Sequence, residues 1–110
     1  MSIRKFKSGS TRDTDKNKHD IEAFINPLVM DRYYAYMNQH RRQSDGKLRE
    51  GDNWQKGFGK DVCAKSLMRH VHDFHLAHRG YKSQQEIDQS LCAIIFNAMA
   101  YILEDNKKHG

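Results

Sequence analysis

Four histidines and one aspartate lie within the nine-residue segment HVHDFHLAH at positions 70–78. Imidazole and carboxylate side chains are frequent metal ligands, so this segment raises the possibility of a metal centre. On a helix, however, the four histidines spread over about 200° of the circumference, and no two have the i, i+4 spacing of an HExxH zinc helix. A zinc site made from this segment alone is therefore not expected, although His75 with His72 or His78 offers half of a site. The favoured interpretation is two half-buried, hydrogen-bonded histidines and two surface histidines.

Three helices are predicted to position this segment and its neighbours. The first begins at Asn26-Pro27, a good N-cap followed by a good first helical residue, and runs to about position 43 with Arg41 and Arg42 in its last turn. The second covers about 61–79 and ends at Gly80, a typical C′ glycine. The third begins at Ser83, where SQQE predicts a capping box, and runs to about position 106. The expected fold class is all-α, with three main helices.

The remaining segments are predicted to be irregular. Residues 44–60, SDGKLREGDNWQKGFGK, contain four glycines and predict a long Gly-rich loop. A long loop in a small domain is usually functional or mobile, and this one carries the only tryptophan, Trp54. Residues 1–20 are polar and lack periodicity, which predicts an extended arm ahead of one helical domain at 21–110. No pair of strands with hairpin chemistry is evident.

The third predicted helix is apolar around most of its circumference, as the run LCAIIFNAMAYIL at 91–103 shows. Such a helix is buried on several sides, and two other helices cannot easily cover it. We therefore expect a homodimer that completes a helical bundle. Asn97 is the polar exception in this run, and a buried Asn must have hydrogen-bond partners. A structural anchor and a role in a ligand pocket both remain open for it.

The composition limits the classes of partner. The 110 residues carry a formal net charge of +5, which permits an anionic partner such as a nucleotide or nucleic acid. Cys63 and Cys92 lie in apolar helical patterns and are expected to be buried free thiols; no CxxC is present for a zinc ribbon. We find neither a signal peptide nor the roughly 18-residue apolar run of a membrane span. A cytoplasmic protein without a membrane partner is expected, in the host cell if the chain is phage-encoded.

Three segments resemble a known family: GDNWQKG at 51–57, KSLMRHVHDFHLAHRG at 65–80 and LCAIIFNAMAYI at 91–102. They are similar to phage proteins of the dATP/dGTP diphosphohydrolase family, which is linked to the all-α MazG-like pyrophosphohydrolases. The similarity covers nearly the whole chain. It implies a helical dimer or tetramer that uses Mg²⁺, held by carboxylates, to cleave a nucleoside triphosphate between its α and β phosphates.

The resemblance also implies roles for individual residues. Trp54 would stack on a purine base, Arg69 and Lys56 would hold phosphates, and His70 would position phosphate or water. The matching positions, with Lys56 added for its charge, give the candidate nucleotide-binding residues Asn53, Trp54, Lys56, Arg69 and Asn97. The candidate catalytic residues are His70 and Asp73.

The chain departs from the family in its carboxylates. It has neither the ExxE nor the ExxD pair of the MazG-like magnesium sites, and Asn97 occupies the position where the late Asp is expected. Asp52 and Glu86 are the candidate metal ligands, and Asp73 and Asp88 could join them. Two hypotheses therefore stay open. One is a purine deoxynucleoside triphosphate-binding protein that possibly hydrolyses it to monophosphate and pyrophosphate. The other is a non-catalytic phage accessory or counter-defence protein that binds a host protein, a signalling nucleotide or nucleic acid.

Overall fold

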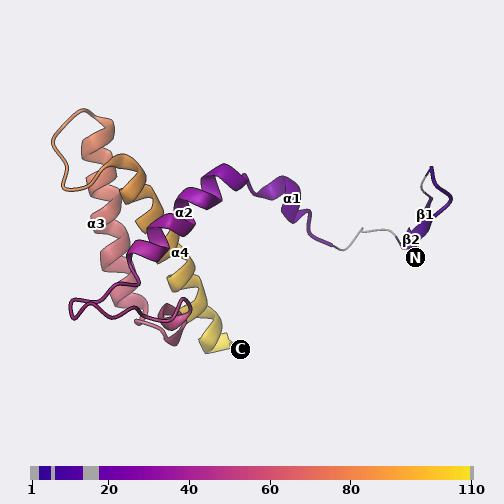
Figure 1. Ribbon diagram of the computed structural model, residues 1–110. Coiled ribbons are helices and arrows are strands. Elements are labelled where there is room, and N and C mark those ends of the chain that lie inside the picture. The colour runs from indigo at the N-terminus through magenta and orange to yellow at the C-terminus, as the bar shows by residue number, and fades with distance from the viewer. Residues whose placement is uncertain (1–2, 6, 14–17, 110) are drawn as a thin grey trace. The chain divides into compact units, whose positions relative to one another are not determined.

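The computed structural model describes residues 3–5, 7–13 and 18–109 and is mostly helical (Figure 1). Its three long helices are α2 (Pro27–Gln39), α3 (Lys60–His78) and α4 (Ile87–His109). A short helix, α1 (Ile21–Phe24), and a 3₁₀ turn, η1 (Asn53–Lys56), complete the helical part. The predicted all-α class with three main helices is confirmed. By its contacts the chain forms two compact units, 1–30 and 31–110, and each is considered by itself.

The first unit contains a small hairpin that the sequence did not lead us to expect. Strand β1 (Ile3–Lys5) pairs antiparallel with β2 (Thr11–Asp13), with Ile3 opposite Asp13. The turn between them includes Gly9 at φ 90°, a conformation that favours glycine. The expectation of no strand pair was therefore wrong. Strands of three residues are too short to show an alternating pattern in the sequence. The next element, α1, is capped by the Asp20 carboxylate, which accepts the Ala23 N–H at 3.1 Å.

Helix α2 begins where it was predicted to begin and ends earlier. The Asn26 side chain accepts the N–H groups of Leu28 and Val29 at 3.0 and 3.2 Å, which confirms the predicted N-cap. The helix ends at Gln39 rather than near position 43, so Arg41 and Arg42 lie outside its last turn. The reason is competition for backbone groups: the Arg41 carbonyl accepts the Arg49 N–H at 2.7 Å and is lost to the helix.

Helices α3 and α4 lie side by side and run in opposite directions (Figure 1). The end of α3 follows the prediction, because Gly80 lies directly after the cap residue with φ 83°. The start of α4 does not, since the helix begins at Ile87 instead of Ser83. The Ser83 hydroxyl donates to the Gln85 carbonyl at 2.6 Å and does not form the expected capping box.

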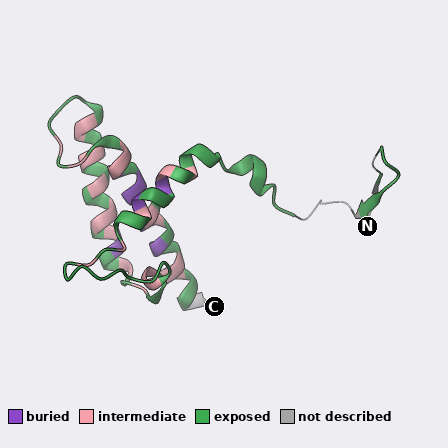
Figure 2. Ribbon diagram, in the orientation of Figure 1, coloured by how far each residue is buried: buried purple, intermediate pink, exposed green. Residues whose placement is uncertain are grey.

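The core of the second unit is small, and most of its buried residues belong to α4 (Figure 2). Tyr33 of α2 is buried, and its hydroxyl donates to the Met99 sulfur at 3.7 Å. Both cysteines are buried and free, as expected, and burial raises the pKa of each thiol. The buried residues are Tyr33, Tyr36, Cys63, Ser90, Cys92, Ala93, Asn97 and Ala100.

The remaining face of α4 stays largely uncovered. Ile87, Leu91, Ile95 and Ile102 lie on this side, and Leu91 and Ile102 are 40% and 60% exposed. Within the described part of the chain, the segment Ile87–Lys107 has the length and composition of a membrane-crossing helix. The core helices of soluble proteins have the same length and composition, so this helix is only weak evidence for a membrane protein.

Candidate functional site

The segment between α2 and α3 is a folded loop with its own backbone pairing. The Arg49 N–H donates to the Arg41 carbonyl at 2.7 Å, and the Gln43 N–H donates to the Lys47 carbonyl at 2.8 Å. Two side chains reinforce this pairing: Arg41 Nε donates to the Arg49 carbonyl at 2.7 Å, and Arg49 Nη1 donates to the His40 carbonyl at 2.9 Å. These bonds hold both arginine side chains beside the end of α2.

The second half of the loop brings aromatic rings against α4. Within η1, Trp54 meets Phe96 of α4 edge to face, with ring centroids 5.5 Å apart and planes at 72°. Phe58 approaches the same ring at 6.1 Å and 71°. Lys107 anchors the turn, because its ammonium group donates to the carbonyls of Gln55 and Lys56, each at 3.2 Å. Edge-to-face geometry is the favourable arrangement for aromatic pairs, so η1 has a preferred position on α4.

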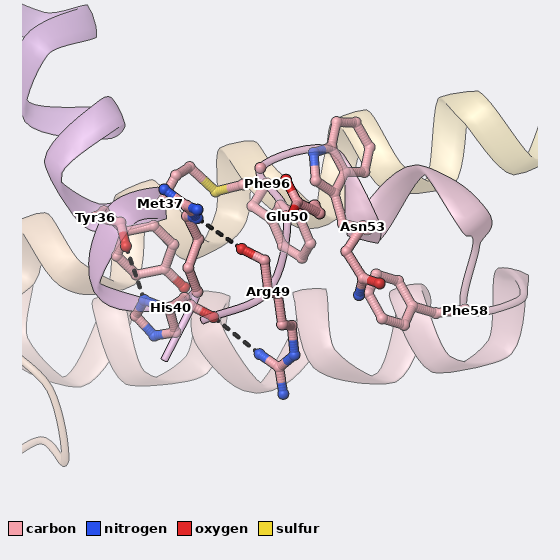
Figure 3. A pocket seen from close by; sticks show the side chains of 11 residues that line it. Tyr36, Met37, His40, Arg49, Glu50, Asn53, Phe58 and Phe96 are labelled. Atoms are coloured by element: carbon pink, nitrogen blue, oxygen red, sulfur yellow. Dashed lines mark hydrogen bonds between the residues drawn. The ribbon is translucent and has the colours of Figure 1, made fainter. Parts of the chain in front are cut away.

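A cavity of about 270 Å³ opens between α2, this loop and α4 (Figure 3). Its walls are largely aromatic and apolar, and its polar side chains include two arginines, a carboxylate, an imidazole and an amide. Figure 3 shows the Arg49 side chain reaching the end of α2, where its Nη1 donates to the His40 carbonyl at 2.9 Å. His40 Nδ1 in turn lies 2.9 Å from the Tyr36 carbonyl. The lining residues are Tyr36, Met37, His40, Arg41, Arg49, Glu50, Gly51, Asn53, Trp54, Phe58 and Phe96.

The structure brings two of the five candidate nucleotide-binding residues into this cavity, Asn53 and Trp54. Lys56 ends η1 with an exposed side chain and does not line the cavity. Arg69 is exposed on α3 and does not line it either. Asn97 is buried in α4, where its amide donates to the Ala93 carbonyl at 2.8 Å. That bond supports the structural interpretation of Asn97, because its N–H group is satisfied within its own helix.

The two candidate catalytic residues belong to a polar network between α3 and the start of α4. The Asp73 carboxylate accepts the backbone N–H groups of Gln84 and Gln85 at 2.7 and 2.8 Å, and the Ser90 hydroxyl at 3.2 Å. These bonds, first of all the one from Gln84, lower the pKa of Asp73. His70 Nδ1 lies 2.9 Å from the Gln85 side-chain oxygen. The network fastens the α3–α4 connection, which explains these two residues without a catalytic role.

The candidate metal ligands do not form a cluster. Asp52 precedes η1 and Glu86 precedes α4, and both are exposed. The third carboxylate considered, Asp88, is bound by Arg32 Nε at 2.6 Å. Over the described ranges, no group of three or more His, Cys, Asp or Glu side chains is placed to hold a metal ion. The described residues therefore do not assemble the multi-carboxylate cluster that the resemblance implies.

Sequence reasoning missed most of the cavity wall. Tyr36, Met37 and Phe96 belong to apolar helical patterns, which predicted packing in the core and no part in a cavity. Arg41 was assigned to a helix end and Arg49 to an unspecified loop, and their pairing is visible only in the folded chain. The signal that pointed to the site was the long loop with its single tryptophan.

Comparison with known proteins adds no assignment: no protein-family model, no curated protein and no solved structure matches this chain.

Proposed function

We propose that the chain binds a purine deoxynucleotide in the cavity between α2, the 40–58 loop and α4. The observation that carries the proposal is an aromatic-walled cavity with two oriented arginines among its lining residues. Ligand sites are typically concave and mostly apolar, with a few placed polar groups. The family resemblance, noted above on the residues around Asn53 and Trp54, points to the same ligand class.

The aromatic part of the cavity supports binding of the base. Stacking of a base on an aromatic side chain contributes roughly 1–3 kcal/mol. Trp54 is held by its contact with Phe96, so its ring loses little freedom when a base stacks on it. Beside it, the Asn53 amide offers both a donor and an acceptor, the pair with which Asn recognises the N6/N7 edge of adenine.

The size of the cavity decides how much of the ligand it encloses. Drug-sized ligands usually occupy cavities of about 300–1,000 Å³. At about 270 Å³, this cavity suits a base with part of its sugar and leaves the phosphates outside. A triphosphate would then extend toward Arg41 and Arg49.

The two arginines supply the charge for those phosphates. Each guanidinium has five N–H donors, and the contacts in the structure use one in Arg41 and one in Arg49. The remaining donors are suited to bidentate bonds with phosphate oxygens. Because the backbone carbonyls already orient both side chains, less conformational entropy is lost on binding.

The proposed function is binding, without a hydrolytic step. The candidates for catalysis, His70 and Asp73, are engaged in the α3–α4 network, and neither lines the cavity. Among the described residues, no group of three or more His, Cys, Asp or Glu side chains is placed to hold a metal ion. The proposal thus joins the ligand class of the first hypothesis with the non-catalytic role of the second.

The uncovered face of α4 supports the expected homodimer. Ile87, Leu91 and Ile95 follow one another at intervals of four residues, which places them on one side of the helix, and Ile102 continues the row. We propose that a second copy of the chain covers this row. Packing two such rows together would bury apolar surface, and each Å² removed from water would stabilise the dimer by about 25 cal/mol.

Isothermal titration with dGTP and dATP, with and without Mg²⁺, tests the nucleotide proposal, with released pyrophosphate measured on the same samples. We expect saturable binding without pyrophosphate release. Trp54→Ala should weaken binding about tenfold or more, since a stacking contact is lost. The matched control is Tyr34→Ala, which removes an exposed aromatic ring of α2 that does not line the cavity. Equal affinities in the two variants, or no binding to the wild type, would exclude this cavity as the site.

Metal-dependent release of pyrophosphate would restore the hydrolase hypothesis.

A further inference from the structure

The outer side of α3 carries a row of basic residues that the proposed nucleotide site does not use. Between positions 62 and 82 the chain has two lysines, two arginines and four histidines, against one carboxylate, Asp73. That carboxylate is occupied by the backbone N–H groups of Gln84 and Gln85. The preceding acidic residue, Asp61, lies back in the first turn of α3. The positive charges of the lysines and arginines in this stretch are therefore not neutralised by a carboxylate of the same stretch.

The helix geometry puts four of these basic residues on one face. Lys65, Arg69, His72 and Arg79 fall within about 80° of one another at 100° per residue, roughly opposite the buried Cys63. All four are exposed. In the described part of the structure, no ion pair or hydrogen bond engages their side chains. From Lys65 to Arg79 the row is about 21 Å long, at 1.5 Å per residue.

The row continues into a fixed turn that exposes an aromatic ring. The Tyr81 N–H donates to the Leu76 carbonyl at 2.9 Å, which holds the turn against the end of α3. The Tyr81 side chain is 66% exposed, and the exposed Lys82 follows it. A tyrosine beside unpaired cations is suited to stacking a base while the cations hold phosphates. An acidic peptide would use the charge of this face and gain little from the ring.

We propose that this surface, the outer face of α3 with residues 79–82, binds single-stranded nucleic acid through its phosphate backbone, with Tyr81 stacking on one base. At about 3.4 Å per nucleotide of a base-stacked strand, the row spans roughly six successive phosphates. Because phosphate contacts carry no sequence information, the binding is nonspecific in sequence. It is also independent of the α2–α4 cavity, since Lys65, Arg69, Arg79 and Tyr81 do not line it.

Fluorescence anisotropy of a labelled 20-nucleotide DNA strand with the full chain, titrated at several salt concentrations, tests the proposal. With three to four phosphates neutralised, we expect log K to fall against log salt with a slope of about −2 to −3. The triple variant Lys65→Gln, Arg69→Gln, Arg79→Gln should bind about tenfold or more weakly and lose about two units of that slope. Tyr81→Ala should weaken binding to the single strand about tenfold and leave binding to a duplex of the same sequence unchanged.

The matched control is Lys5→Gln, Lys7→Gln, Arg12→Gln, which removes the same charge from exposed positions of the N-terminal hairpin. Circular dichroism of each variant establishes that it is folded, and the single variant Arg69→Gln replaces the triple one if that fails to fold. Strong binding by the control and weak binding by the α3 variant would support the proposal. Equal losses of affinity in both triple variants would overturn it, because they would indicate nonspecific attraction by the overall charge. Wild-type binding without salt dependence would also overturn it. Unchanged single-strand binding in Tyr81→Ala would overturn the base-stacking part and leave a plain phosphate-binding face.

Discussion

The indole of Trp54 in η1 meets the ring of Phe96 in α4 edge to face, with 5.5 Å between centroids. This contact joins the loop after α2 to the most apolar helix of the chain, and it forms one wall of the cavity. Phe58 adds a second edge-to-face contact on the same ring. The position of the loop and the shape of the cavity are therefore coupled, because a change that detaches η1 from α4 also opens the cavity.

The fluorescence of Trp54 should report ligand binding directly, since it is the only tryptophan. A base stacked on the indole is expected to quench its emission, and titration with dGTP or dATP should give a saturable curve. Arg49→Gln should shift this curve to about tenfold higher ligand concentration, because it removes a charge-assisted bond to phosphate and the bond to the His40 carbonyl. Arg42→Gln is the matched control, since Arg42 is exposed and does not line the cavity. Identical curves for both variants would contradict the assignment of Arg49.

Gly57→Ala should destabilise the protein through the backbone that follows η1. Gly57 has φ 101°, and a Cβ placed there would meet the ends of the Glu104 and Lys107 side chains. The Lys107 ammonium, which holds η1, would have to shift, and a residue forced into such a backbone conformation costs about 1–3 kcal/mol. Thermal unfolding followed by circular dichroism measures the effect.

The control for that experiment is Gly51→Ala. Gly51 has no positive φ, and a Cβ added there would have no heavy atom within 4 Å. Its substitution should leave the melting temperature unchanged or raise it slightly, because alanine restricts the unfolded chain. A melting temperature for Gly57→Ala as high as that of Gly51→Ala would mean that the loop absorbs the strain.

Asp73→Asn should destabilise the α3–α4 connection in a pH-dependent manner. The bonds from Gln84, Gln85 and Ser90 lower the pKa of Asp73 in the folded state. The stabilisation is therefore fully present above the unfolded pKa of about 3.9 and is lost as the pH falls through the lower folded value. The melting temperature of the variant should lie clearly below that of the wild type at pH 7, and the difference should shrink toward pH 3.

Asp61→Asn is the matched control for the pH series, since Asp61 is exposed in the first turn of α3 and makes none of these bonds. Its melting temperature should follow that of the wild type across the series. If the difference in melting temperature between the wild type and Asp73→Asn stayed constant down to pH 3, the carboxylate charge would not be the stabilising feature.

The elements that sequence reasoning predicted well are those whose signals are local. The Asn26 cap and the Gly80 stop depend on one residue and its neighbours, and both are found. The start of α4 was misplaced because Asp73, a residue of another helix, takes the N–H groups of Gln84 and Gln85. Long-range competition of this kind leaves no mark in the local sequence.

The candidate site was predictable in part for the same reason. Asn53 and Trp54 were proposed from the family resemblance of the loop that contains them, and both line the cavity. Arg49 is held beside the cavity by its bond to the His40 carbonyl at the end of α2. Phe96 lines the cavity where its ring contacts Trp54 of the loop. Neither contact could be read from the local sequence. Asp73 and His70 looked chemical in sequence, yet their partners are backbone amides and a glutamine side chain. Residue type alone cannot separate a hydrogen-bonded support from a reacting group.

The apolar row on α4 makes a definite prediction about assembly. In sedimentation equilibrium the wild type should have about twice the 12.9 kDa mass of one chain, and Ile95→Asp should shift it toward the monomer. An aspartate in the middle of the row would bury a carboxylate without a partner, which costs several kcal/mol. Leu48→Asp is the matched control, because Leu48 is also an exposed apolar residue but belongs to the loop. A wild type that sediments as a monomer at all concentrations would rule out the dimer. Loss of the dimer in both variants would instead place the contact outside the α4 row.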